Sequence, residues 1–153
     1  MSIIDLDVHQ GDGTASICED IDNIQTISVH CEKNFPFKKQ HSDLDIPLPK
    51  DCDDQMYLEA VQMAIQASKT FQPQALIFQG GVDPLKSDRL GKMNISRDGL
   101  RERNTLIFNY ADEHNLPCLV LMGGGYSVPI EDTVDCLADM FLEAAIRHEK
   151  RVT

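Results

Sequence analysis

The chain opens with a segment in which acidic and imidazole side chains alternate with apolar ones. Asp5, Asp7 and His9 stand at every second position. The alternating apolar positions hold Ile4, Leu6 and Val8. Because alternate side chains of an extended strand point to the same face, the three polar groups are expected on one side of a strand. Carboxylates and imidazoles are ligands that proteins offer to zinc, so the segment predicts a metal site at a strand end.

Two later segments end in loops that could complete such a site. The apolar runs 75–79 and 119–122 are short and continuous, which is typical of parallel strands buried on both faces. Residues 80–83 (Gly-Gly-Val-Asp) follow the first run, and residues 123–126 (Gly-Gly-Gly-Tyr) follow the second. Ligands of parallel α/β sheets gather beyond the carboxyl ends of the strands, so the three loops are expected to converge.

Asp83 would then join Asp7 and His9 as a third ligand. Three protein ligands with open coordination positions are the pattern of a catalytic zinc site rather than of a closed structural one. A zinc ion polarises a carbonyl group and makes a bound water more acidic. Asp5 lies one step deeper on the same face, where it could orient a neighbouring histidine or accept a second cation.

The glycines and the tyrosine of these loops fit the same interpretation. Gly80 and Gly81 would let the backbone pass close to the ion, and Gly124 and Gly125 would do the same beneath a substrate. Tyr126 offers a phenol, a neutral donor that suits the oxyanion of a tetrahedral intermediate.

Each motif alone also has an ordinary explanation. An Asp-x-Asp-x-His strand is by itself more often a solvated strand face than a metal site. Gly-Gly-x-Asp is a weak turn signal, and Gly-Gly-Gly-Tyr fits a phosphate cradle or a plain tight turn at least as well. Only the joint occurrence of the three motifs, each at a predicted strand end, favours one metal site.

Strands that alternate with helices predict an α/β fold with a parallel sheet and flanking helices. One domain is expected over residues 1–153, because this length suits a single core. Residues 31–50 contain three prolines and are expected to be irregular, and Ile130, Val134 and Phe141 are expected on the inner side of the last helix. The expected strands are residues 2–8, 24–30, 75–79 and 119–122, and the expected helices are residues 53–71, 96–115 and 127–149.

Composition excludes several classes of function. Lys and Arg total 14 against 25 Asp and Glu, which gives a formal net charge of -11. Nucleic acids and anionic membranes favour basic surfaces, so neither is an expected partner. Five cysteines without a Cys-x-x-Cys pair, no apolar run near the ~20 residues of a membrane span and no recognisable signal peptide favour a cytoplasmic protein with reduced thiols.

Taken together, three segments resemble the histone deacetylase family of the arginase–deacetylase superfamily. They are Ile-Ile-Asp-Leu-Asp-Val-His-Gln-Gly-Asp-Gly at 3–13, Gly-Gly-Val-Asp-Pro-Leu-Lys-Ser-Asp-Arg-Leu-Gly at 80–91 and Gly-Gly-Gly-Tyr at 123–126. The resemblance covers residues 3 to about 141 and is strongest to the class IV and bacterial deacetylase-like branch. It implies the arginase–deacetylase fold and hydrolysis of N-acetyl-lysine, or of a related acylated amine, to the free amine and a carboxylate.

The resemblance also assigns roles to residues. It implies one zinc ion held by Asp7, His9 and Asp83. Tyr126 matches the tyrosine that helps to polarise the acyl carbonyl and to stabilise the intermediate. Asp5 matches the buried aspartate behind a catalytic histidine of the family.

A second implied site is the family's inner monovalent cation site, which usually holds potassium. The matching contributors are Asp5, Ser28 and the backbone of Asp7, His9 and Val29. In addition, Asp88 matches a second aspartate in the loop that follows the third zinc ligand.

One part of the family pattern is missing from the sequence. In the family, two adjacent histidines and a glycine-rich segment precede the Asp-x-Asp-x-His strand, and they provide the general base and part of the acyl tunnel. This sequence has no His-His pair. We therefore expect the C-terminal part of a deacetylase domain, truncated on its N-terminal side, whose first strand has lost a neighbour and forms an open edge prone to self-association.

Three hypotheses about function follow. The first is a zinc deacetylase that needs a complementing N-terminal segment, since positioned acid–base catalysis typically contributes ~10²–10⁴-fold. The second is an inactive remnant that binds a metal or a partner. The third and least favoured is an arginase-like manganese hydrolase, whose binuclear site needs more bridging carboxylates than Asp7 and Asp83 supply.

Overall fold

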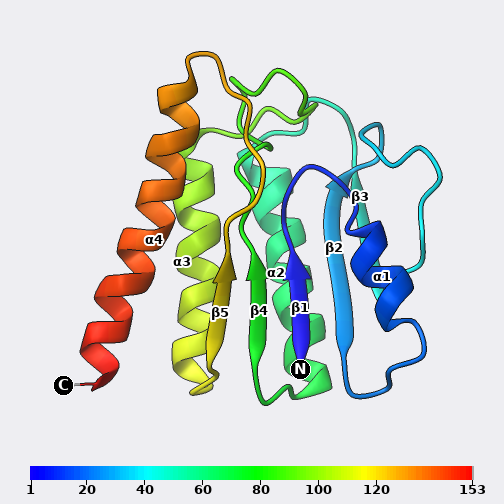
Figure 1. Cartoon of the computed structure of the whole chain (residues 1–153), viewed down its shortest axis with the longest axis vertical. Coiled ribbons are helices and arrows are strands. Elements are labelled where there is room, and N and C mark those ends of the chain that lie inside the picture. Colours follow the sequence, from blue (N-terminus) through cyan, green and yellow to red (C-terminus); the bar gives the residue numbers. More distant parts are fainter. Residues whose placement is uncertain (153) are drawn as a thin grey trace.

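The sequence folds into a five-stranded, wholly parallel β-sheet with helices packed against it (Figure 1). The computed structural model describes residues 1–152, with the side chains of residues 1–151. The elements in chain order are β1 (Ser2–Asp5), α1 (Asp12–Cys18), β2 (Gln25–Cys31), β3 (Leu44–Leu48), α2 (Asp54–Phe71), β4 (Leu76–Gln79), α3 (Arg97–Glu113), β5 (Cys118–Leu121) and α4 (Ile130–Val152). The expected α/β fold with a parallel sheet and flanking helices is confirmed.

β1 lies at the centre of the sheet, whose strand order is β3-β2-β1-β4-β5. It pairs with β2 on one side and with β4 on the other, so that Asp5 stands between Ser28 and Gln79 in the register. The expectation that the first strand forms an open edge is therefore wrong, and the edges of the described sheet are β3 and β5. The central place of β1 puts its loop in the middle of the sheet's carboxyl edge, next to the loop after β4.

β3 corrects a second expectation, because it lies inside residues 31–50, which were expected to be irregular. It pairs in parallel with β2, and Pro47 stands opposite His30. Proline has no backbone N–H and is tolerated in sheets mainly at edge strands. A short strand that contains a proline therefore fits this edge, and the same proline obscured the strand in the sequence.

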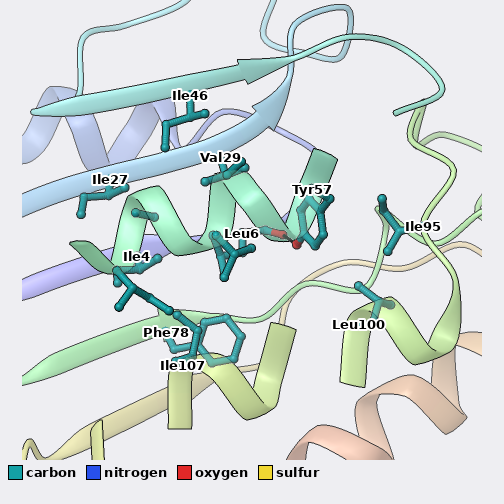
Figure 2. Packing of buried hydrophobic residues seen from close by; sticks show 14 of the residues in the cluster. Ile4, Leu6, Ile27, Val29, Ile46, Tyr57, Phe78, Ile95, Leu100 and Ile107 are labelled. Carbon is teal, nitrogen blue, oxygen red and sulfur yellow. Dashed lines mark hydrogen bonds between the residues drawn. The ribbon is translucent and has the colours of Figure 1, made fainter. Parts of the chain in front are cut away.

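α2 and α3 cover one face of the sheet and form the main core with it (Figures 1 and 2). Both helices begin within one residue of the expected starts, 53 and 96, and each start is capped by a side chain. Asp53 accepts a hydrogen bond from Met56 N, and Ser96 Oγ accepts one from Gly99 N. Each fully buried apolar side chain in this layer contributes about 1.5–3 kcal/mol. Examples that Figure 2 labels are Ile4, Leu6, Tyr57, Phe78, Leu100 and Ile107.

β5 and α4 are less buried than expected. Leu119 and Leu121 of β5, a strand expected to be buried on both faces, are 57% and 39% exposed. Ile130, Val134 and Phe141, expected on the inner side of α4, are exposed as well. The exposure of β5 has a visible cause, because no helix of the described residues covers its other face (Figure 1). α4 packs against α3, and these three side chains lie outside that contact. None of the helices within residues 1–152 has the length and apolar character needed to cross a lipid bilayer.

An apolar row crosses this uncovered face. Ile3 of β1, Ile77 of β4 and Leu119 of β5 are in register with one another. Because successive side chains of a strand alternate between faces, they lie opposite the core residues Ile4 and Phe78. α1 packs against β2 (Figure 1), while Ile3 and Ile77 are partly exposed and Leu119 is exposed. We call Ile3, Ile77 and Leu119 the open sheet face.

Truncation of a buried and of an exposed isoleucine tests the packing of the core. Ile107 of α3 is fully buried, whereas Ile17 of α1 is 78% exposed. Truncation of Ile107 to Ala should lower the free energy of unfolding by about 2–5 kcal/mol, because it leaves a cavity. The same truncation at Ile17 should change it by less than about 0.5 kcal/mol. Urea denaturation followed by circular dichroism measures both variants, and equal losses would contradict the packing described.

Candidate metal centre

The structure brings Asp7, His9 and Asp83 together at the carboxyl edge of the sheet. One ligand atom of each residue lies within 4.8 Å of the others. His9 Nδ1 lies 3.1 Å from Asp83 Oδ2 and 3.6 Å from Asp7 Oδ1. The three residues come from the loops after β1 and β4, which are neighbouring strands. The loops converge as expected, and coordination of a metal by these three groups stays a prediction.

β1 ends at Asp5, three residues earlier than expected, but the alternation of side chains continues beyond it. Leu6 N still donates a hydrogen bond to Gln79 O of β4, so the loop begins as an extension of the strand. Leu6 is buried, whereas Asp7 and His9 are partly exposed. The period of two residues thus places both candidate ligands on the solvent side of the loop.

Backbone donors orient the carboxylates. Asp83 Oδ1 accepts a hydrogen bond from Val8 N at 2.9 Å, and this bond joins the loop after β4 to the loop after β1. Asp7 Oδ1 accepts one from His9 N at 2.6 Å. The second oxygen of Asp83, Oδ2, therefore remains available to contact His9 or to coordinate an ion. Outer hydrogen bonds of this kind hold a coordinating carboxylate in place.

Two glycines let the loops approach these carboxylates. A Cβ atom added to Gly81 would lie 2.5 Å from the Cβ of Asp7, and one added to Gly124 would lie 3.1 Å from Asp83 Oδ2. The first distance leaves no room for a side chain, and the second is tighter than ordinary packing. The other two glycines of the predicted site, Gly80 and Gly125, pack instead against side chains of α4.

Negative charge is concentrated in this cluster. Burial raises the pKa of Asp5 well above its ordinary value, and the nearby carboxylate of Asp7 raises it further. Burial likewise raises the pKa of Asp7. Hydrogen bonds to Asp7 and to Asp83 raise the pKa of His9 to about 10. At neutral pH, the metal-free cluster therefore uses the imidazolium of His9 as its counter-charge.

A divalent cation fits the same position. Ligating imidazole is neutral, so an ion held by these side chains would replace the proton of His9 as the positive charge among the acids. Two carboxylate oxygens and one imidazole nitrogen form a donor set that zinc accepts, with a fourth position left open. The donor set and the charge of the cluster therefore suit zinc.

Asp88 links the two glycine-containing loops. Its Oδ1 accepts hydrogen bonds from Leu90 N and Gly91 N, both at 2.8 Å, and its Oδ2 accepts one from Tyr126 N. The backbone of Tyr126 is thereby attached to the loop that carries Asp83. The side chain of Tyr126 is 55% exposed. The phenol is accessible from solvent, and its role in stabilising an oxyanion stays a prediction.

Asp5 and Ser28 lie side by side below the cluster. They are directly paired in the register of β1 and β2, and both are buried. Asp5 Oδ1 accepts a hydrogen bond from Asp7 N, and Ser28 Oγ accepts one from Gly11 N. Val29 could contribute only its backbone, because its side chain is in the core. Two neighbouring oxygen donors suit a monovalent cation, whose binding here stays a prediction.

The sequence interpretation missed Arg103, although this residue is fully buried beneath the cluster. Its guanidinium donates to the backbone carbonyls of Gly81 at 2.7 Å and of Gly80 at 3.2 Å. One signal could have found it. Arg103 follows Leu100 by three residues and precedes Ile107 by four, a spacing that puts a charged residue on the apolar face of α3.

The fold and the cluster define an α/β protein with a candidate metal centre at the carboxyl edge of its sheet. Residues 1–143 match the histone deacetylase domain, and the chain therefore belongs to the histone deacetylase family. It is 41% identical over 133 residues to an uncharacterized protein of Picosynechococcus sp., covering 86% of this chain and 44% of that protein. It is 33% identical over 128 residues to histone deacetylase 2 of Arabidopsis thaliana, covering 81% of this chain and 33% of that protein.

Solved structures agree with this assignment. The crystal structure of an HDAC homologue from Aquifex aeolicus matches with a TM-score of 0.79 and 26% identity, over 93% of this chain and 40% of that chain. The chain thus spans less than half the length of the relatives and of the structure that it matches.

Loss of a candidate ligand should weaken zinc binding sharply. His9→Ala removes the imidazole, and Asp83→Asn removes a charge while it keeps the shape. Each should lower zinc affinity by more than the ~10–100-fold that loss of an outer hydrogen-bond partner costs. Competition with a chromophoric chelator measures the affinity. His148→Ala, at an exposed histidine of α4, is the matched control and should bind zinc as the unaltered chain does. Full affinity in His9→Ala would contradict the ligand assignment.

Proposed function

We propose that this chain carries the metal-binding part of a zinc-dependent deacetylase, which hydrolyses N-acetyl-lysine or a related acylated amine. The observation that carries the proposal is the meeting of Asp7, His9 and Asp83 at one strand edge in a chain of the histone deacetylase family. The side chain of His9 is 34% exposed, so the cluster is open to a ligand from solvent.

The proposed roles are those that the family resemblance implies, and the meeting of Asp7, His9 and Asp83 supports them. Asp7, His9 and Asp83 would hold one zinc ion, which when bound polarises the acyl carbonyl and makes a bound water more acidic. The water oxygen adds to the carbonyl carbon, the C–N bond breaks, and a proton passes to the departing amine. Tyr126 donates a hydrogen bond to the carbonyl oxygen as it gains negative charge. Its neutral O–H does this without adding a charge to the site.

The general base is the role that this sequence does not fill. Its five histidines stand singly, whereas the family resemblance places a pair of adjacent histidines in this role. A positioned acid or base typically contributes ~10²–10⁴-fold to the rate. We therefore propose that the base belongs to a complementing segment, in the same polypeptide or in a partner, that corresponds to the part of the relatives outside the match.

The open sheet face and the free edge of β5 are the proposed docking surface for that segment. Ile3, Ile77 and Leu119 form an apolar row, and β5 has a strand partner on one side only. An unpaired edge strand accepts a further strand through its free backbone groups. We infer that this segment occupies the docking surface from the length of the relatives: the chain matches 44% of the Picosynechococcus protein and 40% of the Aquifex structure. In both, more chain accompanies the matched part than is contained in it.

Co-expression with the part of the Picosynechococcus protein that this chain does not match tests the proposed function. We expect one zinc ion per chain by elemental analysis, and hydrolysis of an acetyl-lysine peptide that exceeds that of the chain alone by ~10²–10⁴-fold. Leu119→Lys should abolish the gain, because it places a charge in the docking surface. Leu142→Lys, at an exposed leucine of α4 that lies outside this surface, is the matched control.

Other outcomes of this experiment distinguish the competing hypotheses. One bound zinc ion without hydrolysis in either preparation favours a non-catalytic metal-binding protein. Two manganese ions per chain would favour an arginase-like hydrolase. Self-association of the chain that Leu119→Lys prevents would assign the open sheet face to a second copy instead of a complementing segment.

Tyr126→Phe should separate binding from turnover. Removal of one oxyanion donor typically costs ~10²–10³-fold in turnover, so the complemented protein should lose activity by about that factor. Zinc affinity should not change, because the phenol is not among the proposed ligands. The control is Tyr110→Phe, which removes a buried hydroxyl that hydrogen-bonds to Ser68 away from the cluster. Peptide hydrolysis and chelator competition on the same samples decide the case, and unchanged turnover in Tyr126→Phe would exclude this role.

A further inference from the structure

We infer that Arg103 is a positioning residue for the metal centre, an inference that rests on the proposed function. Its side chain is fully buried. It has no carboxylate partner among the ion pairs of the described residues, which is unusual for a buried charge. A charge that is costly to bury and is not paired with an acid must be held by other polar groups.

Every N–H group of the guanidinium has such a partner. Nη1 donates to Gly81 O at 2.7 Å and to the hydroxyl of Tyr57 at 3.5 Å. Nη2 donates to Gly80 O at 3.2 Å and to Asn104 Oδ1 at 2.9 Å, and Nε donates to Asn104 Oδ1 at 3.0 Å. The five donors of an arginine are thus all used, and four of the bonds are well within hydrogen-bonding distance. A lysine could not reproduce this fork.

The acceptors belong to the loop that carries Asp83. β4 ends at Gln79, so the carbonyls of Gly80 and Gly81 lie past the sheet's ladder. Arg103 supplies the donors that the ladder no longer offers at this point. Gly81 is in turn the residue that packs against Asp7, and Asp83 follows two positions later. The guanidinium therefore fixes the backbone immediately before one candidate ligand and beneath another.

The same arginine reaches the other ligand loop through Tyr57. The Tyr57 hydroxyl donates to Leu6 O at 2.6 Å, and Leu6 directly precedes Asp7 (Figure 2). Tyr57 comes from α2 and Arg103 from α3, so both helices under the sheet contribute to one network. The network joins the backbones of the two ligand loops, and a separate hydrogen bond from Val8 N to the Asp83 carboxylate also connects these loops. We therefore expect the spacing of Asp7, His9 and Asp83 to depend on it.

The test compares metal binding by the full chain and its variants, with zinc and cobalt as the probes. Arg103→Lys keeps a positive charge but loses the fork. Tyr57→Phe removes only the hydroxyl and is the milder change should Arg103→Lys fail to fold. We expect a ~10–100-fold loss of zinc affinity in Arg103→Lys, the range for outer partners of metal ligands, and a smaller loss in Tyr57→Phe. The visible absorption bands of bound Co²⁺, which report coordination geometry, should shift in both.

Two controls separate positioning from general stability. Tyr110→Phe is the same substitution at another buried tyrosine and should leave zinc affinity and the Co²⁺ spectrum unchanged. Ile107→Ala lowers stability on the same helix without touching the network, and should also leave the spectrum unchanged. Unaltered affinity and spectrum in both Arg103→Lys and Tyr57→Phe would overturn the inference while the proposed function stands. Absence of zinc binding by the unaltered chain would instead overturn the proposed function and this inference with it.

Discussion

Acidic side chains that meet at the ends of two neighbouring buried strands are the constraint on which the rest of this structure depends. Burial and the neighbouring carboxylate raise the pKa of Asp5, and burial raises that of Asp7, so keeping both ionised is unfavourable unless a positive charge lies close by. His9 provides it in the metal-free chain, and a divalent ion would provide it in a loaded one. The backbone hydrogen bonds to these carboxylates, and the glycines that approach them, keep this unfavourable arrangement in one geometry.

The geometry of the cluster depends on three kinds of polar group: the carboxylates, the backbone carbonyls of the ligand loops and the guanidinium of Arg103. The carboxylates of Asp5 and Asp83 are buried at the sheet edge, and the guanidinium of Arg103 donates to the backbone carbonyls of Gly80 and Gly81, in the loop that carries Asp83. Carbonyl dipoles thus point at this cation. The helices that form the core therefore also set the geometry of the loops, so packing and site geometry cannot be varied independently.

Much of this arrangement could be predicted from the sequence, because local patterns carried it. Alternation placed Asp5, Asp7 and His9 on one side, and Asp53 and Ser96 marked the starts of two helices. The predictions that were wrong concern features that depend on residues close in space but distant in sequence. The central place of β1 and the exposure of Leu119 follow from the strand order, which no local pattern encodes. Pro47 hid an edge strand, and the role of Arg103 depends on carbonyls about twenty residues away in sequence.

The source of the three candidate ligands has a consequence for how such a protein matures. Asp7, His9 and Asp83 come from loops after adjacent strands, and none is contributed across the open sheet face. On the proposed function, capture of the ion and arrival of the general base are then two separate events. A chain that has bound its ion would still lack the general base until the complementing segment docks, and docking would then raise its rate of hydrolysis.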